Sequence, residues 1–293
     1  MPLRFAHGPE TIRVGDFKVR RFGFGAMRLP GKEVWGEPDD PARAHAVLRR
    51  AIEHGINLID TAWYYGPFVA NRLIAEALHP YPSDLVIATK LGARRNPDKS
   101  WVPALTAEAL LEGVEHDLRT LRLEQLPLVH LRWVEQTEVT FEEALDALIA
   151  IQATGKIRHI GLSGITFEQL EIAVARTPIA CVQNLFNMGG PGHQLDTARP
   201  EAVLAACEER GIAFLPFFPL AIGSLTSAGG ALAAAAKRHN CTPAQLALAW
   251  LLARSPVMLP IPGTSKVAHL DENVGALHVT IDHTALAELG PNA

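Results

Sequence analysis

The chain has 293 residues, of which 48% are hydrophobic, and this is enough for a sizeable core in one α/β domain spanning residues 1–293. Its formal net charge is −4 at pH 7, and the sequence holds no basic cluster. This balance argues against a nucleic-acid or membrane surface as the partner and favours a small-molecule ligand.

The N-terminal region predicts a β-hairpin. Thr11–Val14 and Phe17–Val19 are short alternating segments, and Gly15-Asp16 between them is a two-residue turn signal. We expect this hairpin to plug one end of the fold.

Phe22–Met27 follows as the first strand of the main sheet. Its glycines Gly23 and Gly25 begin a GxGxxG pattern, but Arg28 stands where the third glycine belongs, and no helix follows at once. A Rossmann fold is therefore not predicted, although these glycines are compatible with a close approach of the backbone to a ligand.

The rest of the chain alternates strands and helices. Further strands are expected at Leu58–Asp60, Val86–Lys90, Leu126–His130, His159–Ser163, Cys181–Leu185, Phe214–Phe217 and Val257–Ile261. Helices are expected at Ala42–His54, Asn71–Leu78, Thr106–Leu121, Phe141–Ala153, Thr166–Arg176, Ala198–Arg210, Ala231–Arg238, Pro243–Arg254 and Val267–Leu277. Such units with right-handed crossovers predict an α/β fold of the (β/α)8 TIM barrel type with an N-terminal β-hairpin.

Single polar residues stand at the ends of three of these strands. Asp60, Lys90 and His130 each close an apolar run, and Tyr65 follows Asp60 by five residues. Because the carboxyl ends of barrel strands meet at one face, we expect these side chains to share one site.

The four residue types suit the reduction of a carbonyl group, which needs a proton donor and stabilisation of the developing alkoxide. Tyr65 can be the acid if Lys90 lowers its pKa from the usual value of about 10. Asp60 would keep the lysine charged, and His130 would donate a hydrogen bond to the carbonyl oxygen.

The order of these motifs resembles the aldo-keto reductases, specifically the bacterial-type NADP-dependent members. The likeness rests on Asp60-Thr61-Ala62-x-x-Tyr65-Gly66, the strand ends at Lys90 and His130, the stretch 155–163 and Ile261-Pro262-Gly263-Thr264-Ser265. The resemblance implies that the four residues form a catalytic tetrad. It also implies an oxidoreductase that reduces aldehydes or ketones with NADPH, which becomes NADP+.

The same resemblance implies a set of cofactor-binding residues. They are Gly25, Met27, Ser163, Gln183, Phe217, Leu220, Ser224, Thr264, Ser265, Lys266, His269 and Asn273.

Several positions depart from the family pattern. Gly164 replaces a usual asparagine, so one contact to the nicotinamide carboxamide is expected to be missing. Phe217 stands where a tyrosine is common, and it retains the ring for stacking. Gly263 and His269 replace a lysine and an arginine that recognise the 2′-phosphate, a role that Lys266 can take over.

Other functions remain open from the residues alone. Lys90 could form a Schiff base in a lyase barrel, or the chain could be a regulatory subunit that binds a nucleotide with slow turnover. Four large aromatic residues, Trp63, Trp101, Trp133 and Phe186, are candidates for a pocket wall, but packing is the more common role of such residues, as it is for Tyr64. The substrate and the oligomeric state are not indicated.

Cys181, Cys207 and Cys241 are an odd number at wide spacing, so neither a disulfide framework nor a zinc site is expected. The histidines form no HExxH motif, and no metal is predicted. The N-terminus lacks the long apolar core of a signal peptide, and the apolar runs are too short for a bilayer span. We therefore expect a cytoplasmic protein.

Overall fold

The computed structural model describes residues 6–135, 138–188, 200–220 and 231–281. The strands are β1 (Thr11–Val14), β2 (Phe17–Arg20), β3 (Phe24–Gly25), β4 (Leu58–Asp60), β5 (Val86–Arg95), β6 (Trp101–Ala104), β7 (Leu126–Arg132), β8 (Ile157–Ser163), β9 (Ile179–Gln183) and β10 (Ala213–Phe214). The helices are α1 (Pro41–Glu53), α2 (Val69–Leu78), α3 (Ala107–Leu121), α4 (Phe141–Ala153), α5 (Phe167–Val174), α6 (Pro200–Arg210), α8 (Ala231–Arg238), α9 (Pro243–Arg254) and α10 (Val267–Val274). Short 3-10 turns are η1 (Ala26–Arg28), η2 (Lys32–Val34) and η4 (Gly275–His278).

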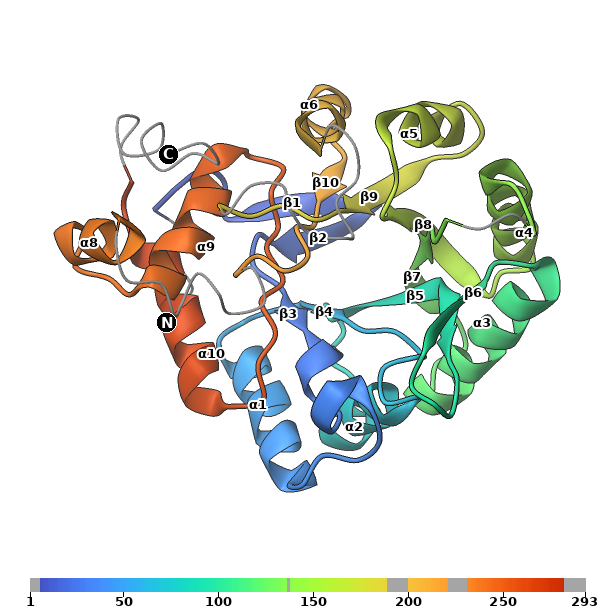
Figure 1. The fold of residues 1–293 in the computed structure, drawn as a ribbon, viewed down its shortest axis with the longest axis horizontal. Helices are drawn as coiled ribbons and strands as arrows, with labels where there is room; N and C mark the ends of the chain where they lie inside the picture. Colours follow the sequence, from blue (N-terminus) through green and yellow to red (C-terminus); the bar gives the residue numbers. More distant parts are fainter. Residues whose placement is uncertain (1–5, 136–137, 189–199, 221–230, 282–293) are drawn as a thin grey trace.

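The parallel strands form a curved sheet in the order β10-β9-β8-β7-β5-β4-β3, and the helices surround it (Figure 1). The segment 257–262 joins its two edges through backbone hydrogen bonds. They run from Phe214 N–H to Val257 O, from Leu259 N–H to Phe214 O, from Gly23 N–H to Pro260 O and from Gly25 N–H to Pro262 O, at 2.8 to 3.2 Å. The predicted TIM barrel is confirmed.

The N-terminal hairpin is also confirmed, with Val14 paired to Phe17 across the turn. Val14 and Val19 are fully buried and belong to one apolar cluster with inward-facing strand residues such as Leu58, Leu128 and Leu215. The hairpin therefore fills the barrel end opposite to the carboxyl ends of the strands, which leaves those ends as the open face.

Side-chain caps fix several helix starts. Asp40 accepts a hydrogen bond from Arg43 N–H at the start of α1. Thr140, Thr166 and Thr242 each form a capping box with the Glu or Gln three residues later. These caps explain why α1, α4, α5 and α9 begin within a residue of the positions predicted.

Two strands run further than their sequence pattern predicts. β5 passes Lys90 and ends at Arg95, where it pairs antiparallel with β6, an additional strand that was not expected. β7 passes His130 and ends at Arg132. Polar side chains at the open end of a barrel strand do not interrupt its backbone hydrogen bonds, so functional residues are poor markers of where a strand stops.

Residues predicted as the eighth strand, 257–261, form no regular ladder. Pro260 and Pro262 have no N–H to donate, so this segment contributes isolated hydrogen bonds to its neighbours. It still occupies the eighth position in the barrel wall.

No described helix is long and apolar enough to cross a membrane. Within the same residues, no group of three or more His, Cys, Asp or Glu side chains is placed to hold a metal ion. All three cysteines are free thiols, and Cys181 and Cys207 are buried.

Arg21 is a fully buried arginine that ties the N-terminal segment to the segment after α9. Its guanidinium donates to the carbonyl oxygens of His7, Pro9, Leu252, Ser255 and Met258 at 2.6 to 3.3 Å. Burial lowers the pKa of Arg21 to about 10, which leaves the side chain charged at neutral pH. Five carbonyl groups would lose a donor without it.

We predict that Arg21→Met lowers the free energy of unfolding by about 3 to 5 kcal/mol, because buried acceptors are left without partners. The exposed Arg13→Met is the control and should stay within about 0.5 kcal/mol of the parent chain. Urea unfolding followed by circular dichroism measures both, and a loss below about 1 kcal/mol for Arg21→Met would contradict this role.

Candidate active site

A buried ion pair lies at the carboxyl ends of β4 and β5. Lys90 Nζ donates to Asp60 Oδ2 at 2.6 Å and to the Thr61 carbonyl oxygen at 2.9 Å. The other carboxylate oxygen of Asp60 accepts from Gln183 Nε2 at 2.8 Å. The side chains of Asp60 and Lys90 are 5% and 4% exposed, so the two charges are almost completely removed from water.

Tyr65 lies next to this pair, in the loop that follows β4. Lys90 Nζ is 5.0 Å from the centre of the tyrosine ring. Burial raises the pKa of Tyr65 well above its usual value, the charge of Asp60 raises it further, and the charge of Arg132 lowers it. The expected lowering of this pKa is therefore wrong, and Tyr65 keeps its proton at neutral pH.

His130 lies deeper in the barrel than was expected for a substrate contact. Its Nδ1 is 3.2 Å from the Thr89 carbonyl oxygen, which can only accept, so the ring carries its proton there. Nε2 faces Cys181 Sγ at 3.2 Å, and burial lowers the pKa of His130 to about 4. The neutral ring thus accepts from the Cys181 thiol, and His130 does not border the cleft described below.

A second buried network holds the strand ends that carry the ion pair. Thr61 Oγ1 donates to Asn71 Oδ1 at 2.8 Å, and Asn71 Nδ2 lies 2.5 Å from Asp117 Oδ1. Thr89 Oγ1 lies 2.6 Å from Asp117 Oδ2. Thr61 and Thr89 neighbour Asp60 and Lys90 in sequence and face outward because side chains alternate along a strand. The network therefore anchors both strand ends to α2 and α3.

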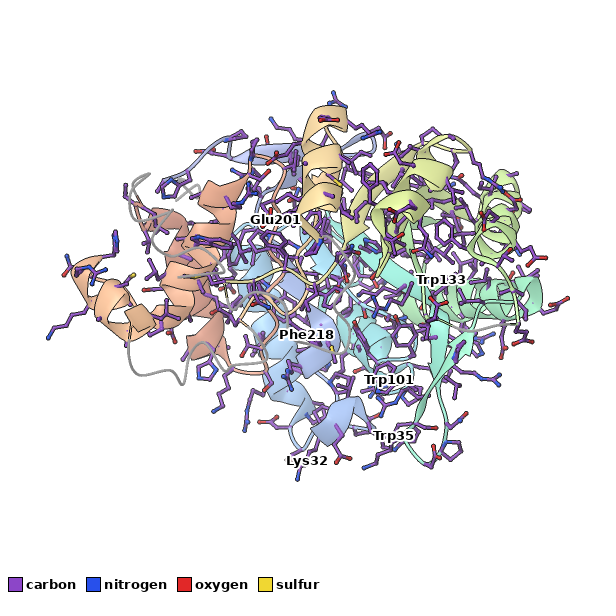
Figure 2. The ribbon with its side chains drawn as sticks, turned by 45° about the horizontal axis from the view of Figure 1, so that its top comes forward. Lys32, Trp35, Trp101, Trp133, Glu201 and Phe218 are labelled. Atoms are coloured by element: carbon purple, nitrogen blue, oxygen red, sulfur yellow. The ribbon has the colours of Figure 1, made fainter. Side chains whose placement is uncertain are left out.

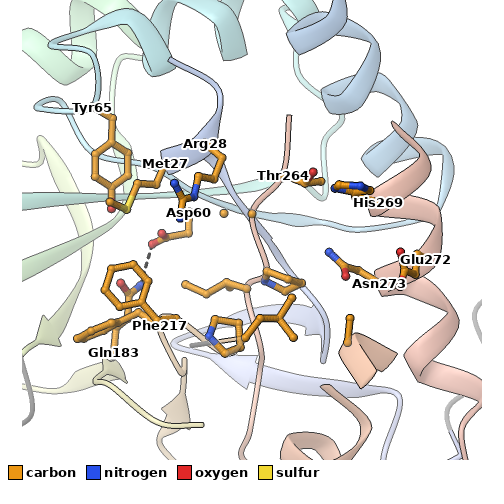
Figure 3. Close-up of a pocket in the computed structure, with 18 residues that line it drawn as sticks. Met27, Arg28, Asp60, Tyr65, Gln183, Phe217, Thr264, His269, Glu272 and Asn273 are labelled. Carbon is orange, nitrogen blue, oxygen red and sulfur yellow. Dashed lines mark hydrogen bonds between the residues drawn. The ribbon is translucent and has the colours of Figure 1, made fainter. Parts of the chain in front are cut away.

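A cleft of about 410 Å³ opens at this face of the barrel. Figure 3 shows Tyr65, Asp60 and Gln183 at one end and Thr264, His269 and Asn273 at the other. Apolar side chains line the space between them: Phe217, Phe218, Pro219, Leu220, Ile261 and Pro262. This size and lining suit an elongated organic ligand with polar groups at both ends.

A second cleft of about 490 Å³ continues from the first and shares Met27, Arg28, Thr264 and His269 with it. Its lining includes the cations Arg28, Lys32, Arg43 and Lys266 together with the acids Glu33, Asp39 and Asp40. Ser265 and Lys266 stand directly before α10, whose first N–H groups favour an anion.

The structure brings most of the predicted cofactor residues together. Eight of them border the first cleft: Gly25, Met27, Gln183, Phe217, Leu220, Thr264, His269 and Asn273. Ser265 and Lys266 border the second. Ser163 borders neither but lies beside Gln183 in the sheet register, and Ser224 is outside the described residues.

The orientation of the Gln183 amide indicates whether these residues can bind the carboxamide of a nicotinamide ring. Because the Asp60 carboxylate can only accept, the amide nitrogen of Gln183 must face it, and the amide oxygen points elsewhere. No donor among the described residues reaches that oxygen. An amide oxygen beside an aromatic shelf at Phe217 matches the needs of a carboxamide on a flat ring.

The large aromatic residues are mainly packing groups. Phe186 stacks in the core on Trp250, and Trp133 packs against Phe141. Tyr64 is 4% exposed and lies edge-on to Tyr65 and to Trp101. Figure 2 shows Trp101 and Trp35 near each other at one edge of the molecule. The Arg95 guanidinium lies 4.1 Å from the centre of the Trp101 ring and 5.4 Å from the centre of the Trp35 ring.

Two basic residues near the site were not anticipated. Arg28 borders both clefts, and Arg132 lies over the Phe217 ring at 5.3 Å. Arg132 has a sequence signal, since it stands two residues after His130 on one strand and so faces the same side. Arg28 was considered only as an interruption of a glycine pattern.

Known proteins resemble this chain over almost its whole length. Residues 21–290 match the model of the Aldo/keto reductase family. Pyridoxine 4-dehydrogenase of Escherichia coli is 43% identical over 285 residues, which cover 96% of this chain and 97% of the relative. An uncharacterised oxidoreductase of Schizosaccharomyces pombe is 42% identical over 95% of this chain and 88% of its own length.

Solved structures show the same likeness. A thermostable aldo-keto reductase in complex with the inhibitor epalrestat is 28% identical, with a TM-score of 0.79 over 96% of this chain and 97% of that one. An aldo/keto reductase of Klebsiella pneumoniae in complex with NADP and acetate is 26% identical, with a TM-score of 0.76 over 96% of this chain and 94% of the other.

Asp117 makes the stability of the fold depend on pH. Burial raises its pKa to about 7, against which the hydrogen bonds from Thr89 and Asn71 and the charge of Lys90 act. In the unfolded chain the pKa of an aspartate is about 3.9. Between about pH 4 and pH 7 the folded chain therefore binds more protons at Asp117 than the unfolded chain does. Its contribution to stability is thus complete below about pH 4 and is lost as the pH rises toward about 7.

We predict that Asp117→Asn, which imitates the protonated acid, becomes more stable relative to the parent chain as the pH rises. Its advantage in free energy of unfolding should grow by about 2 to 4 kcal/mol from pH 4 to pH 8. Urea unfolding across this range measures the difference, and the exposed Asp84→Asn controls for the loss of a carboxylate. A difference between Asp117→Asn and the parent that does not change with pH would show that Asp117 does not titrate in this range.

Proposed function

The chain belongs to the aldo/keto reductase family and is an NADPH-dependent oxidoreductase of carbonyl compounds, and we propose that Tyr65 is its proton donor. The observation that carries this assignment is the position of Lys90. Its ammonium pairs with Asp60 at 2.6 Å and lies 5.0 Å from the centre of the Tyr65 ring, at the end of a cleft lined by Gln183 and Phe217.

The residues divide the chemistry among them. When bound, the nicotinamide supplies the hydride that reaches the carbonyl carbon. Tyr65 gives its phenolic proton to the carbonyl oxygen as negative charge develops there. The Lys90 ammonium, which is paired with Asp60, stabilises the phenolate that remains. Gln183 and Phe217 would hold the carboxamide and the ring face of the cofactor.

The role of His130 in this scheme is indirect. His130 is a neutral buried ring between Thr89 and Cys181 that orders the floor of the site. Donation to the substrate would require His130 to change partners and to move its proton to Nε2.

The substrate is proposed from the relatives. The Escherichia coli protein is named for pyridoxine, an alcohol attached to an aromatic ring, and it shares 43% identity with this chain. We infer that this chain acts on small aromatic aldehydes and the matching alcohols, with pyridoxal and pyridoxine as the first pair to test. We also propose that the chain is one barrel domain that acts in the cytoplasm.

The geometry of Lys90 disfavours a Schiff-base lyase. A Schiff base needs the lysine nitrogen free to attack a carbonyl, whereas Lys90 Nζ donates to both Asp60 Oδ2 and the Thr61 carbonyl oxygen. A regulatory subunit without turnover would need no buried acid beside an ammonium.

We predict that Tyr65→Phe lowers kcat for aldehyde reduction by at least about 1000-fold, because general acid catalysis and stabilisation of the charged transition state are both lost. The Kd for NADPH, measured by quenching of tryptophan fluorescence, should change by no more than a few-fold. Lys90→Met should behave in the same way.

Tyr64→Phe is the matched control, since Tyr64 is an equally buried tyrosine next in sequence. It should retain most of kcat. Retention of most of kcat by Tyr65→Phe would remove the assignment of the acid, and NADPH binding without turnover across a panel of aldehydes would favour the regulatory alternative.

Preference for NADPH over NADH is proposed to depend on the second cleft. A 2′-phosphate needs cations and donors, and Lys266, Arg28 and the start of α10 provide them there. Gly263 offers no side chain in place of the lysine that is usual in the family.

We predict that Lys266→Ala reduces the ratio of Kd for NADH to Kd for NADPH about tenfold, the effect of one lost charge-assisted contact. Lys18→Ala, an exposed lysine of the hairpin on the closed side, is the control. Fluorescence titration with both nucleotides measures the ratio. An unchanged ratio in Lys266→Ala would assign the preference to other cations such as Arg28.

A further inference from the structure

Arg132 occupies a distinct position in the barrel wall. In the sheet register it pairs with Ser163 on β8, which pairs with Gln183 on β9. Lys90 and His130 form a row two residues earlier on β5 and β7. Residues two apart on a strand face the same side, so Arg132 faces the barrel interior one layer nearer the open face than His130.

The guanidinium of Arg132 has no carboxylate partner in the part of the chain that the structure describes. Its contacts are Ser163 Oγ at 3.5 Å, which is a weak hydrogen bond, and the Phe217 ring at 5.3 Å. The residue is half-buried. A guanidinium removed from water without an anion is costly, and most proteins pair such a group.

Gly164 provides the space that this guanidinium uses. A Cβ atom at position 164 would overlap Arg132 Nη1, and the backbone there has a φ of +70°. The backbone is fixed by hydrogen bonds from Gly164 N–H to the Gln183 carbonyl oxygen and to Asn184 Oδ1. Gly164 was expected only to remove a contact to the nicotinamide carboxamide. It also leaves the space that the Arg132 guanidinium occupies.

The charge of Arg132 reaches the proton donor. Burial lowers the pKa of Arg132, and the charge of Arg132 acts against burial to lower the pKa of Tyr65. Arg132 lies over the ring of Phe217, and Phe217 and Tyr65 both line the first cleft.

We propose that Arg132 is the substrate-recognition residue of this site and binds an anionic oxygen that the substrate carries beside its carbonyl group. The inference rests on the proposed function and defines its substrate class as aldehydes with an ionised hydroxyl or carboxylate next to the reacting carbon. A planar guanidinium can contact such an oxyanion while the carbonyl oxygen meets Tyr65. Pyridoxal, with a ring hydroxyl beside its aldehyde, is a member of this class.

Two structural roles compete with this proposal. Arg132 could hold the Phe217 ring in place through its cation–π contact, or it could orient Ser163. Either role affects all substrates alike because it acts through the cofactor site. Recognition of an oxyanion affects only substrates that carry the oxyanion in the right position.

The experiment uses three aldehydes of similar shape at pH 7.5 with NADPH. 2-Hydroxy-5-nitrobenzaldehyde has a phenolate beside the aldehyde, 4-hydroxy-3-nitrobenzaldehyde has it on the far side of the ring, and 3-nitrobenzaldehyde has none. The alcohol products are quantified by chromatography, which avoids the overlap of nitrophenolate and NADPH absorbance. The parent chain, Arg132→Met, Arg132→Lys and the exposed rim control Arg94→Met are compared.

Arg132→Met is expected to lower kcat/KM for the 2-hydroxy aldehyde by about 30- to 100-fold, the range of one hydrogen bond to a charged group. For the other two aldehydes the change should be no more than about 3-fold. Arg132→Lys, which keeps the charge but loses the planar fork, should show an intermediate loss confined to the 2-hydroxy aldehyde, and this variant also serves if Arg132→Met does not fold. Arg94→Met should leave all three values unchanged.

Equal losses for all three aldehydes in Arg132→Met or Arg132→Lys would overturn the inference and assign Arg132 to the cofactor shelf. An unchanged kcat/KM for the 2-hydroxy aldehyde in Arg132→Met would overturn it as well. A parent chain that reduces 3-nitrobenzaldehyde keeps the proposed function in both cases. If the parent chain reduces none of the three, the proposed function fails, and the inference fails with it.

Discussion

The buried pair of Asp60 and Lys90 is the interaction on which the site depends. Two charges with almost no exposure cost several kcal/mol of solvation each, and their attraction compensates only when the remaining hydrogen bonds are made. Here they are made, because Asp60 uses both oxygens and Lys90 also donates to the Thr61 carbonyl oxygen. The network of Thr61, Thr89, Asn71 and Asp117 fixes the two strand ends, so that the pair keeps this geometry.

The strand period then sorts the polar residues into layers. Lys90 and His130 share one row, and the row two residues later holds Arg132 and Ser163, followed by Gln183. The lower row is fully used inside the protein, since both ring nitrogens of His130 have protein partners. In the upper row, no described residue donates to the Gln183 amide oxygen, and no described carboxylate pairs with the Arg132 guanidinium. We therefore propose that the upper row recognises the ligand.

The sequence predicts the barrel, the hairpin and the residues at the strand ends because each rests on local patterns such as alternation, turn residues and helix caps. It does not predict β6, although β6 forms a local hairpin with the end of β5. It does not predict the pairing of 257–262 either, which depends on partners far along the chain. The sequence also does not predict the hydrogen-bond partners of His130 or the direction in which the pKa of Tyr65 is shifted. Both are set by burial among residues from the four strands β4, β5, β7 and β9, which no single stretch of sequence specifies.

The substitution at Gly164 shows how one position changes the chemistry of its neighbour. A Cβ atom there would come within 2.0 Å of Arg132 Nη1, so a side chain at 164 would force the guanidinium to shift. With glycine at 164, the cation keeps its place in a protein whose net charge is −4. At long range the molecule repels anions slightly, whereas close to the site the attraction of the nearby cation is larger than this weak repulsion. The selection of an anionic substrate that we propose for this site would therefore be a short-range effect, sensitive to where the oxyanion lies on the substrate.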